Sequence, residues 1–152
     1  MAKSKGNLRY AAAIVGCSVA YYFLASLVLA RLPFVAVPPT WLAHGLSPMM
    51  AVVTWFQLLN VLGCVLAAIP VSIGIVWASP RFMQLFAFAV SMITATVVVG
   101  RLFDSDMSPT DHPSMAYWIN FAVLFVAFLL AVPLTVYVVA MSRESLRLRR
   151  TA

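Results

Sequence analysis

Two amide side chains lie one helical turn apart inside a very apolar segment, TWFQLLNVLGC, at residues 54–64. Gln57 and Asn60 each carry hydrogen-bond donors and an acceptor, so in hydrocarbon they require polar partners. One interpretation is that they hydrogen-bond across neighbouring helices and hold them together. The other is that they line a path or pocket for a polar solute. The residue types fit both uses.

Similar polar side chains recur at helical spacing in the later apolar segments. At about 100° per residue, Gln57 and Asn60 share one side of their helix with small residues, whereas Leu59 and other bulky side chains occupy the opposite side, toward lipid. The same arithmetic applies to the following two segments. We therefore expect an interhelical polar stripe, or a possible lining, made of Gln57, Asn60, Gln84, Ser91, Thr94 and Asn120.

Asp, Glu, Lys and His are absent from the central part of every apolar segment. Proton-coupled pumps and ion-driven carriers usually need such groups, whereas a pore for a neutral solute does not. The motifs GxSxG and HExxH and the phosphate-binding loop are also missing. We therefore expect that the chain is not an enzyme.

Metal and cofactor sites are not expected either. The acidic loop that starts at Asp104 lacks the glycine of a calcium-binding loop. Both histidines, His44 and His112, lie in loops, which argues against a haem held between helices. Cys17 and Cys64 lie inside apolar segments and outside any CxxC motif, so we interpret them as small packing residues.

Composition points to a membrane. Of the 152 residues, 64% are hydrophobic and 9% are charged, which exceeds what a soluble domain of this size can bury. Four apolar segments each exceed the roughly 18–20 residues that cross ~30 Å of hydrocarbon, whereas barrel strands would give ~10-residue alternating segments. We predict an all-α polytopic membrane protein with one four-helix transmembrane domain over 10–142. Its helices should span about 10–31, 48–77, 80–103 and 114–141.

Basic residues predict the orientation. Eight of the ten lysines and arginines fall in the segment 1–9, at Arg81 or in the tail 143–152, and only Arg31 and Arg101 fall on the other side. By the positive-inside rule both termini should be cytoplasmic, and we expect a multi-pass protein of the bacterial cytoplasmic (inner) membrane. The first apolar segment is longer than the ~7–15-residue hydrophobic region of a signal peptide, so we expect it to span the membrane rather than to be cleaved. The net charge of +6 should then attract anionic lipid headgroups and not nucleic acid.

Serine–proline pairs predict where two helices begin. Ser47 precedes Pro48, and Ser79 precedes Pro80. A serine hydroxyl caps the first free backbone N–H groups, and a proline fits the first helical position because it has no N–H to satisfy.

Two further prolines and two arginines have alternative roles. Pro70 and Pro133 should kink their helices, either to shape packing or as a matched pair of hinges that expose a backbone carbonyl. Arg31 and Arg101 should lie at helix C-termini in the outer interface, where the helix dipole favours a cation. We expect both arginines to act as interface anchors, with an anion site between them as the alternative.

The two halves of the chain resemble each other. LVLARL is similar to VVVGRL at the ends of the first and third helices, and LAAIPVSIGIVWAS is similar to LLAVPLTVYVVAMS in the second and fourth. The second alignment pairs Pro70 with Pro133 and Ser72 with Thr135. We interpret this as a duplicated helical hairpin, related by a pseudo-twofold axis along the membrane normal. Chance similarity between valine-rich helices is the alternative.

Two functional hypotheses follow. The leading one is a non-enzymatic accessory or scaffold subunit that self-associates or docks on a larger membrane complex. It rests on the polar stripe, on the absence of catalytic residues and on the apolar loop at 32–47, which would serve as an interfacial anchor or a docking surface. The second hypothesis is a small oligomeric channel or transporter for a neutral or anionic solute, with the polar stripe as its lining.

Overall fold

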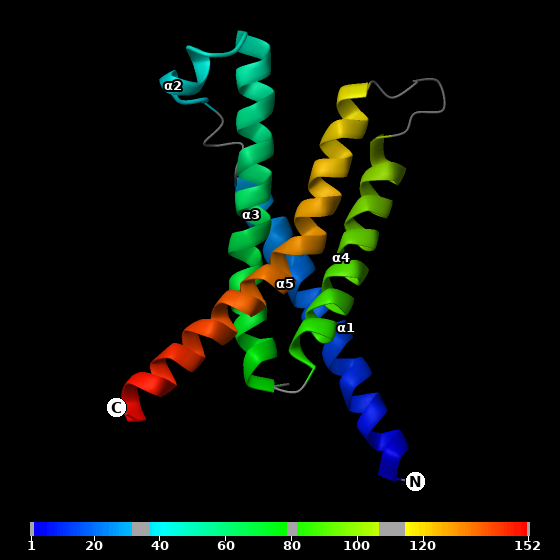
Figure 1. Cartoon of the computed structure of the whole chain (residues 1–152). Coiled ribbons are helices and arrows are strands. Elements are labelled where there is room, and N and C mark those ends of the chain that lie inside the picture. Colours follow the sequence, from blue (N-terminus) through cyan, green and yellow to red (C-terminus); the bar gives the residue numbers. More distant parts are fainter. Residues whose placement is uncertain (1, 32–36, 79–81, 107–114, 152) are drawn as a thin grey trace.

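Helices make up nearly all of the chain that the structure describes. The structure is a computed structural model that describes residues 2–31, 37–78, 82–106 and 115–151. No strand occurs among these residues, which confirms the all-α prediction. Figure 1 shows the helices that they form: α1 (Ala2–Arg31), α2 (Thr40–Ala43), α3 (Pro48–Ala78), α4 (Met83–Asp106) and α5 (Met115–Thr151).

Three of these helices are long and apolar enough to cross a membrane. The apolar spans are Arg9–Arg31 in α1, Pro48–Ala78 in α3 and Trp118–Ser145 in α5. At ~1.5 Å per residue each is longer than the ~30 Å hydrocarbon layer. Within the described residues α4 has a shorter apolar segment, Met83–Val98. The chain is therefore a multi-pass membrane protein.

The helices differ at their ends from the ranges expected from hydropathy. Helix α1 begins at Ala2 instead of about residue 10, and α5 continues to Thr151 instead of ending near 141. Hydropathy detects only the part of a helix that suits hydrocarbon, whereas helical hydrogen bonding continues through polar residues in water. The first turn of α3 is capped as predicted, because the Met50 backbone N–H donates to Ser47 Oγ at 3.4 Å. The second predicted cap, at Ser79, lies outside the described residues.

The four long helices alternate in direction. In Figure 1, α1 and α4 run upward and α3 and α5 run downward, so the start of α1 and the end of α5 lie at the same end of the molecule. We call this the termini end, and we call the opposite end, which carries α2, the loop end. Helix α3 packs against α1 and α5, and α4 packs against the same two helices. The contacts therefore form a ring in the order α1, α3, α5, α4.

An aromatic pair closes the centre of this ring. The Tyr21 ring of α1 and the Phe128 ring of α5 are both fully buried and meet edge to face, with centroids 5.6 Å apart. Tyr21 also donates its hydroxyl proton to the Cys64 carbonyl oxygen of α3 at 3.3 Å. Around this pair the core consists mainly of small and branched residues, which allow close approach of helix backbones. Among them are Ala67, Ala68, Ala87, Val90, Ala95 and Val132.

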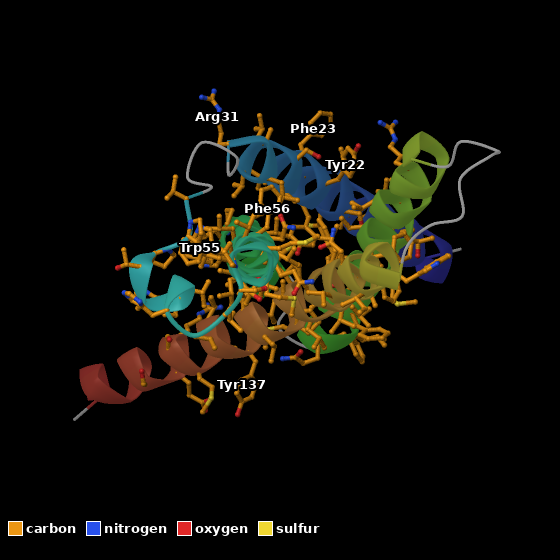
Figure 2. All side chains as sticks on the ribbon, turned by 90° about the horizontal axis from the view of Figure 1, so that it is seen from above. Tyr22, Phe23, Arg31, Trp55, Phe56 and Tyr137 are labelled. Carbon is orange, nitrogen blue, oxygen red and sulfur yellow. The ribbon has the colours of Figure 1, made fainter. Side chains whose placement is uncertain are left out.

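Large apolar side chains cover the outside of the long helices. Figure 2, a view along α3, shows Phe23 of α1 and Tyr137 of α5 pointing away from the other helices on opposite sides. Leu62 and Leu66 of α3 are exposed as expected, but Leu59 is buried, so its predicted lipid-facing position is wrong. The prediction assumed that the same face of the helix is buried along its whole length. Because α1 crosses α3 obliquely in Figure 1, the buried face of α3 changes along its length.

Candidate functional site

Two members of the predicted polar stripe are buried on α4. Thr94 Oγ1 lies 2.9 Å from the Val90 carbonyl oxygen of its own helix and 3.3 Å from the Ser18 carbonyl oxygen of α1. Its single proton is therefore shared between an intrahelical bond and a bond to the neighbouring helix. Ser91 is fully buried, and its Oγ has no hydrogen-bond partner among the described residues.

The two amide side chains of the predicted polar stripe on α3 lie in the loop-end half of this helix. Gln57 and Asn60 are both half-buried and fall within the apolar span of that helix. No side-chain hydrogen bond joins either amide to another residue that the structure describes. Hydrocarbon offers an amide nothing to bond with. These two side chains therefore need a partner from outside the described residues, such as water or another polypeptide.

The remaining two predicted stripe residues are exposed. Gln84 lies in the first turn of α4 and Asn120 lies in the second turn of α5. Gln84 shares a helix face with the buried Ser91, seven residues later. Asn120 shares a helix face with the half-buried Ala127, also seven residues later. Facing the same direction as a buried residue therefore does not by itself bury a side chain. The structure thus does not bring the six residues together as one stripe.

A pair of hydroxyls joins α3 to α5 in the termini-end half. Ser72 Oγ and Thr135 Oγ1 hydrogen-bond to each other, and Ser72 Oγ also lies 3.5 Å from the Val132 carbonyl oxygen. Thr135 Oγ1 lies 2.7 Å from the Ala131 carbonyl oxygen. Each hydroxyl has one proton, and the shorter of the two carbonyl contacts favours donation from Thr135 to Ala131 and from Ser72 to Thr135. We call Ser72 and Thr135 the hydroxyl clasp.

The clasp lies directly after the two prolines. Pro70 and Pro133 are both inside their helices, each two residues before a clasp hydroxyl. In Figure 1, α5 changes direction within its orange segment, where Pro133 lies. Sequence reasoning did not identify the clasp as a contact. A signal was available, because the repeat alignment had already paired Ser72 with Thr135.

A basic side chain adds a second connection at the termini end. Arg143 Nη1 of α5 donates to the Val76 carbonyl oxygen in the last turn of α3, at 3.2 Å. The last carbonyls of a helix lack intrahelical partners and carry partial negative charge, so a guanidinium both caps them and complements the helix dipole. Sequence reasoning assigned Arg143 only to the basic tail.

Arg31 and Arg101 occupy different environments. Arg31 is the last residue of α1, is exposed, and points away from the other helices in Figure 2. Helix α4 continues to Asp106, so the expectation that Arg101 lies at a helix C-terminus is wrong. Its Nη1 donates to the Tyr22 hydroxyl oxygen at 3.3 Å, and its guanidinium carbon lies 5.7 Å from the centre of the Tyr22 ring.

Arg101 and Tyr22 form part of a pocket between three helices. The pocket encloses about 400 Å³, within the ~300–1,000 Å³ range of small-ligand sites. We call it the Arg101 pocket. It is lined by Tyr22, Ser26 and Leu29 of α1, Val98 and Arg101 of α4, and Leu124 and Phe128 of α5.

Two other hollows lie between the helices. A groove of about 450 Å³ between α3 and α5 is lined only by apolar residues, including Val61 and Val126. A pocket of about 410 Å³ toward the termini end is lined by Arg9, Tyr10 and apolar side chains from α1, α3 and α4. No hydrogen bond to Arg9 occurs among the described residues, so the Arg101 pocket is the better-defined polar site.

The charged groups that predicted orientation and metal binding are only partly described. Among the described residues no group of three or more His, Cys, Asp or Glu side chains is placed to hold a metal ion. His44 is exposed in the segment after α2. The side chains of the acidic loop from Asp104 to His112, of Arg81 and of the tail beyond Ser145 lie outside the described residues.

Comparison of the chain with protein-family models, with curated proteins and with solved structures finds no match. A fold alone does not specify an activity, because unrelated functions share the same helical architectures. Function must here be argued from the side chains and their surroundings.

Proposed function

We propose that this chain is a non-enzymatic accessory or scaffold subunit of the bacterial cytoplasmic membrane, which self-associates or docks on a larger membrane complex. The observation that carries the proposal is the pair of amides on α3. Gln57 and Asn60 lie within an apolar span, are half-buried, and have no side-chain partner in the described chain. A second polypeptide that packs against this part of α3 would supply the missing hydrogen bonds and exclude lipid.

The helix arrangement supports four membrane crossings. The start of α1 and the end of α5 lie at the same end of the molecule, which requires an even number of crossings. Helix α4 runs antiparallel to α3 and α5 over a comparable height, so we assign it the remaining crossing in a four-helix bundle. With the excess of basic residues at the termini end, the positive-inside rule then favours a cytoplasmic position for both termini.

The contacts also support a duplicated hairpin. A pseudo-twofold axis between α3 and α5 would bring equivalent residues of these two helices next to each other. Ser72 and Thr135, which the repeat alignment pairs, hydrogen-bond to each other at this position.

Assembly is tested by removal of the two amides. Substitution of Gln57→Leu together with Asn60→Leu should reduce the oligomer or complex that is recovered, measured by cross-linking in native membranes and by light scattering of the purified protein. Gln84→Leu is the matched control, because it removes an exposed amide from the end of a span and should leave assembly unchanged. Unchanged assembly in the double variant would contradict the proposal.

A small oligomeric channel or transporter for a neutral or anionic solute is the second candidate, and the partial exposure of Asn60 favours it. A membrane-impermeant thiol reagent separates the two candidates. Single cysteines at Asn60 and at the fully buried Ser91 would be introduced into a chain that lacks Cys17 and Cys64. Labelling at both positions would indicate a continuous aqueous path and favour transport, whereas protection at both would favour the scaffold.

A further inference from the structure

We propose that the Arg101 pocket binds the phosphate of an anionic membrane lipid. The phosphate of the lipid would lie between the Arg101 guanidinium and the Tyr22 hydroxyl. The part of the lipid's hydrocarbon chain nearest the headgroup would lie against Val98, Leu124 and Phe128. This inference rests on the pocket alone and does not depend on the assembly proposed above.

The position of the Arg101 side chain is the first argument. An arginine that serves only as an interface anchor extends its charge away from hydrocarbon, toward water and headgroups. Arg101 instead contacts Tyr22, which lies about two and a half turns before the end of α1. Side chains of a helix lean toward its N-terminus, and for Arg101 this direction leads toward the middle of the protein. The guanidinium therefore lies beside α1 in the loop-end half of the protein, although Arg101 as a whole is exposed.

The hydrogen-bonding capacity of the pair is the second argument. A guanidinium has five N–H donors in a planar fork that matches phosphate oxygens. Only one donor of Arg101 is directed at Tyr22, the tyrosine is neutral, and no ion pair to Arg101 occurs among the described residues. The Tyr22 hydroxyl accepts this bond through its oxygen and keeps its own proton to donate. Ser26, one turn further along α1, adds another hydroxyl to the same pocket.

The apolar walls select an amphiphile over a free anion. The remaining lining residues of the Arg101 pocket are leucine, valine and phenylalanine side chains. A free phosphate would gain nothing from these walls and would lose its hydration against them. A lipid supplies a charged headgroup and a hydrocarbon chain at the same time, a combination that basic pockets between transmembrane helices bind on the cytoplasmic side of other membrane proteins.

Native mass spectrometry of the purified full-length chain tests the proposal. The protein would be released from a neutral detergent after addition of phosphatidylglycerol, phosphatidylcholine or inorganic phosphate. We expect saturable binding of phosphatidylglycerol, weaker by about fivefold in Arg101→Gln, since one arginine near a membrane surface contributes about that factor. Arg31→Gln is the matched control: it removes an interfacial charge that lies outside the pocket, and it should change binding by less than about twofold.

Three outcomes would overturn the proposal. Equal losses in Arg31→Gln and Arg101→Gln would indicate general attraction to basic residues, and equal binding of phosphatidylcholine would remove the requirement for a net negative headgroup. Competition by inorganic phosphate at the concentration of the lipid would show that the anion is free phosphate and not a lipid. If Arg101→Gln is not recovered as a folded protein, Ser26→Trp provides a second variant. It fills the pocket without altering the arginine and should abolish saturable binding.

Discussion

The two ends of this molecule differ in how their polar groups are satisfied. At the termini end, α3 and α5 are joined by the hydroxyl clasp and by the bond from Arg143 to the Val76 carbonyl oxygen. At the loop end, Gln57 and Asn60 of the same α3 have no side-chain partner among the described residues, and Arg101 borders a pocket. The central aromatic pair, Tyr21 and Phe128, separates the two regions.

This difference indicates which region serves the fold and which is left for other molecules. Inside a membrane, polar groups associate helices because lipid offers them no alternative. Polar groups that are already paired within the chain stabilise it and have little to offer a partner. Polar groups that remain unpaired contribute little to the fold but can bind another helix, a lipid or water. We therefore expect substitutions at the termini end to affect stability and substitutions at the loop end to affect binding.

Removal of the central ring should have the largest effect and disturb both regions. Phe128→Ala deletes a fully buried ring that packs on Tyr21, and core substitutions of this kind cost about 3 kcal/mol. The free energy of unfolding can be measured in micelles by titration with a denaturing detergent, followed by circular dichroism. Tyr137→Ala on the same helix removes an exposed ring and is the control. Equal losses from the two substitutions would contradict the placement of Phe128 in the core.

Loss of the hydroxyl clasp should have the next largest effect, confined to stability. Ser72→Ala combined with Thr135→Val removes the bond between α3 and α5 while it preserves the approximate side-chain volume, and we expect a loss of about 1 kcal/mol. Ser142→Ala is the control, because among the described residues its hydroxyl bonds only to the Val138 carbonyl oxygen of its own helix. If the double variant unfolds at the same detergent fraction as the original chain, the claim that paired polar groups at the termini end stabilise the fold would be wrong.

Much of the fold could be predicted from the sequence, because membrane insertion imposes simple rules. Long apolar segments in a chain this hydrophobic must be helical, since backbone groups in hydrocarbon have to be satisfied within the segment. The cap at Ser47 could be predicted because it depends only on adjacent residues. The buried position of Leu59 could not, because it depends on the angle at which α1 crosses α3.

The candidate site was less predictable, for a related reason. Helical periodicity predicts which face of a helix a residue lies on. It does not predict whether a neighbouring helix covers that face at the residue's position along the helix axis. Gln84 and Ser91 share a face of α4, yet Gln84 is exposed and Ser91 is buried. Arg101 was taken for a helix-end residue because hydropathy ends there, whereas α4 continues to Asp106. Its contact with Tyr22 joins residues from two helices, so it cannot be predicted from the residues next to Arg101 in the sequence.

Removal of two neighbouring hydroxyls on α4 should affect stability differently. Thr94→Val removes a bond that reaches the Ser18 carbonyl oxygen of α1, and we expect a loss of about 0.6 kcal/mol. Ser91→Ala removes a fully buried hydroxyl that has no partner among the described residues, so the free energy of unfolding should stay the same or rise. Unfolding titrations of the two variants in the same detergent compare them directly. Destabilisation by Ser91→Ala would indicate a bond that this arrangement of side chains lacks.

The smallest effect on stability is expected where the largest effect on assembly is proposed. Gln57→Leu with Asn60→Leu removes two amides that have no side-chain partner in the described chain, so the free energy of unfolding of the dispersed monomer should change by less than about 0.5 kcal/mol. The measurement requires dilute protein in excess detergent, where a partner contributes nothing. A loss as large as that of the clasp variant would mean that the amides hold this chain together. The loop end would then be stabilised in the same way as the termini end, and the contrast between the two regions would disappear.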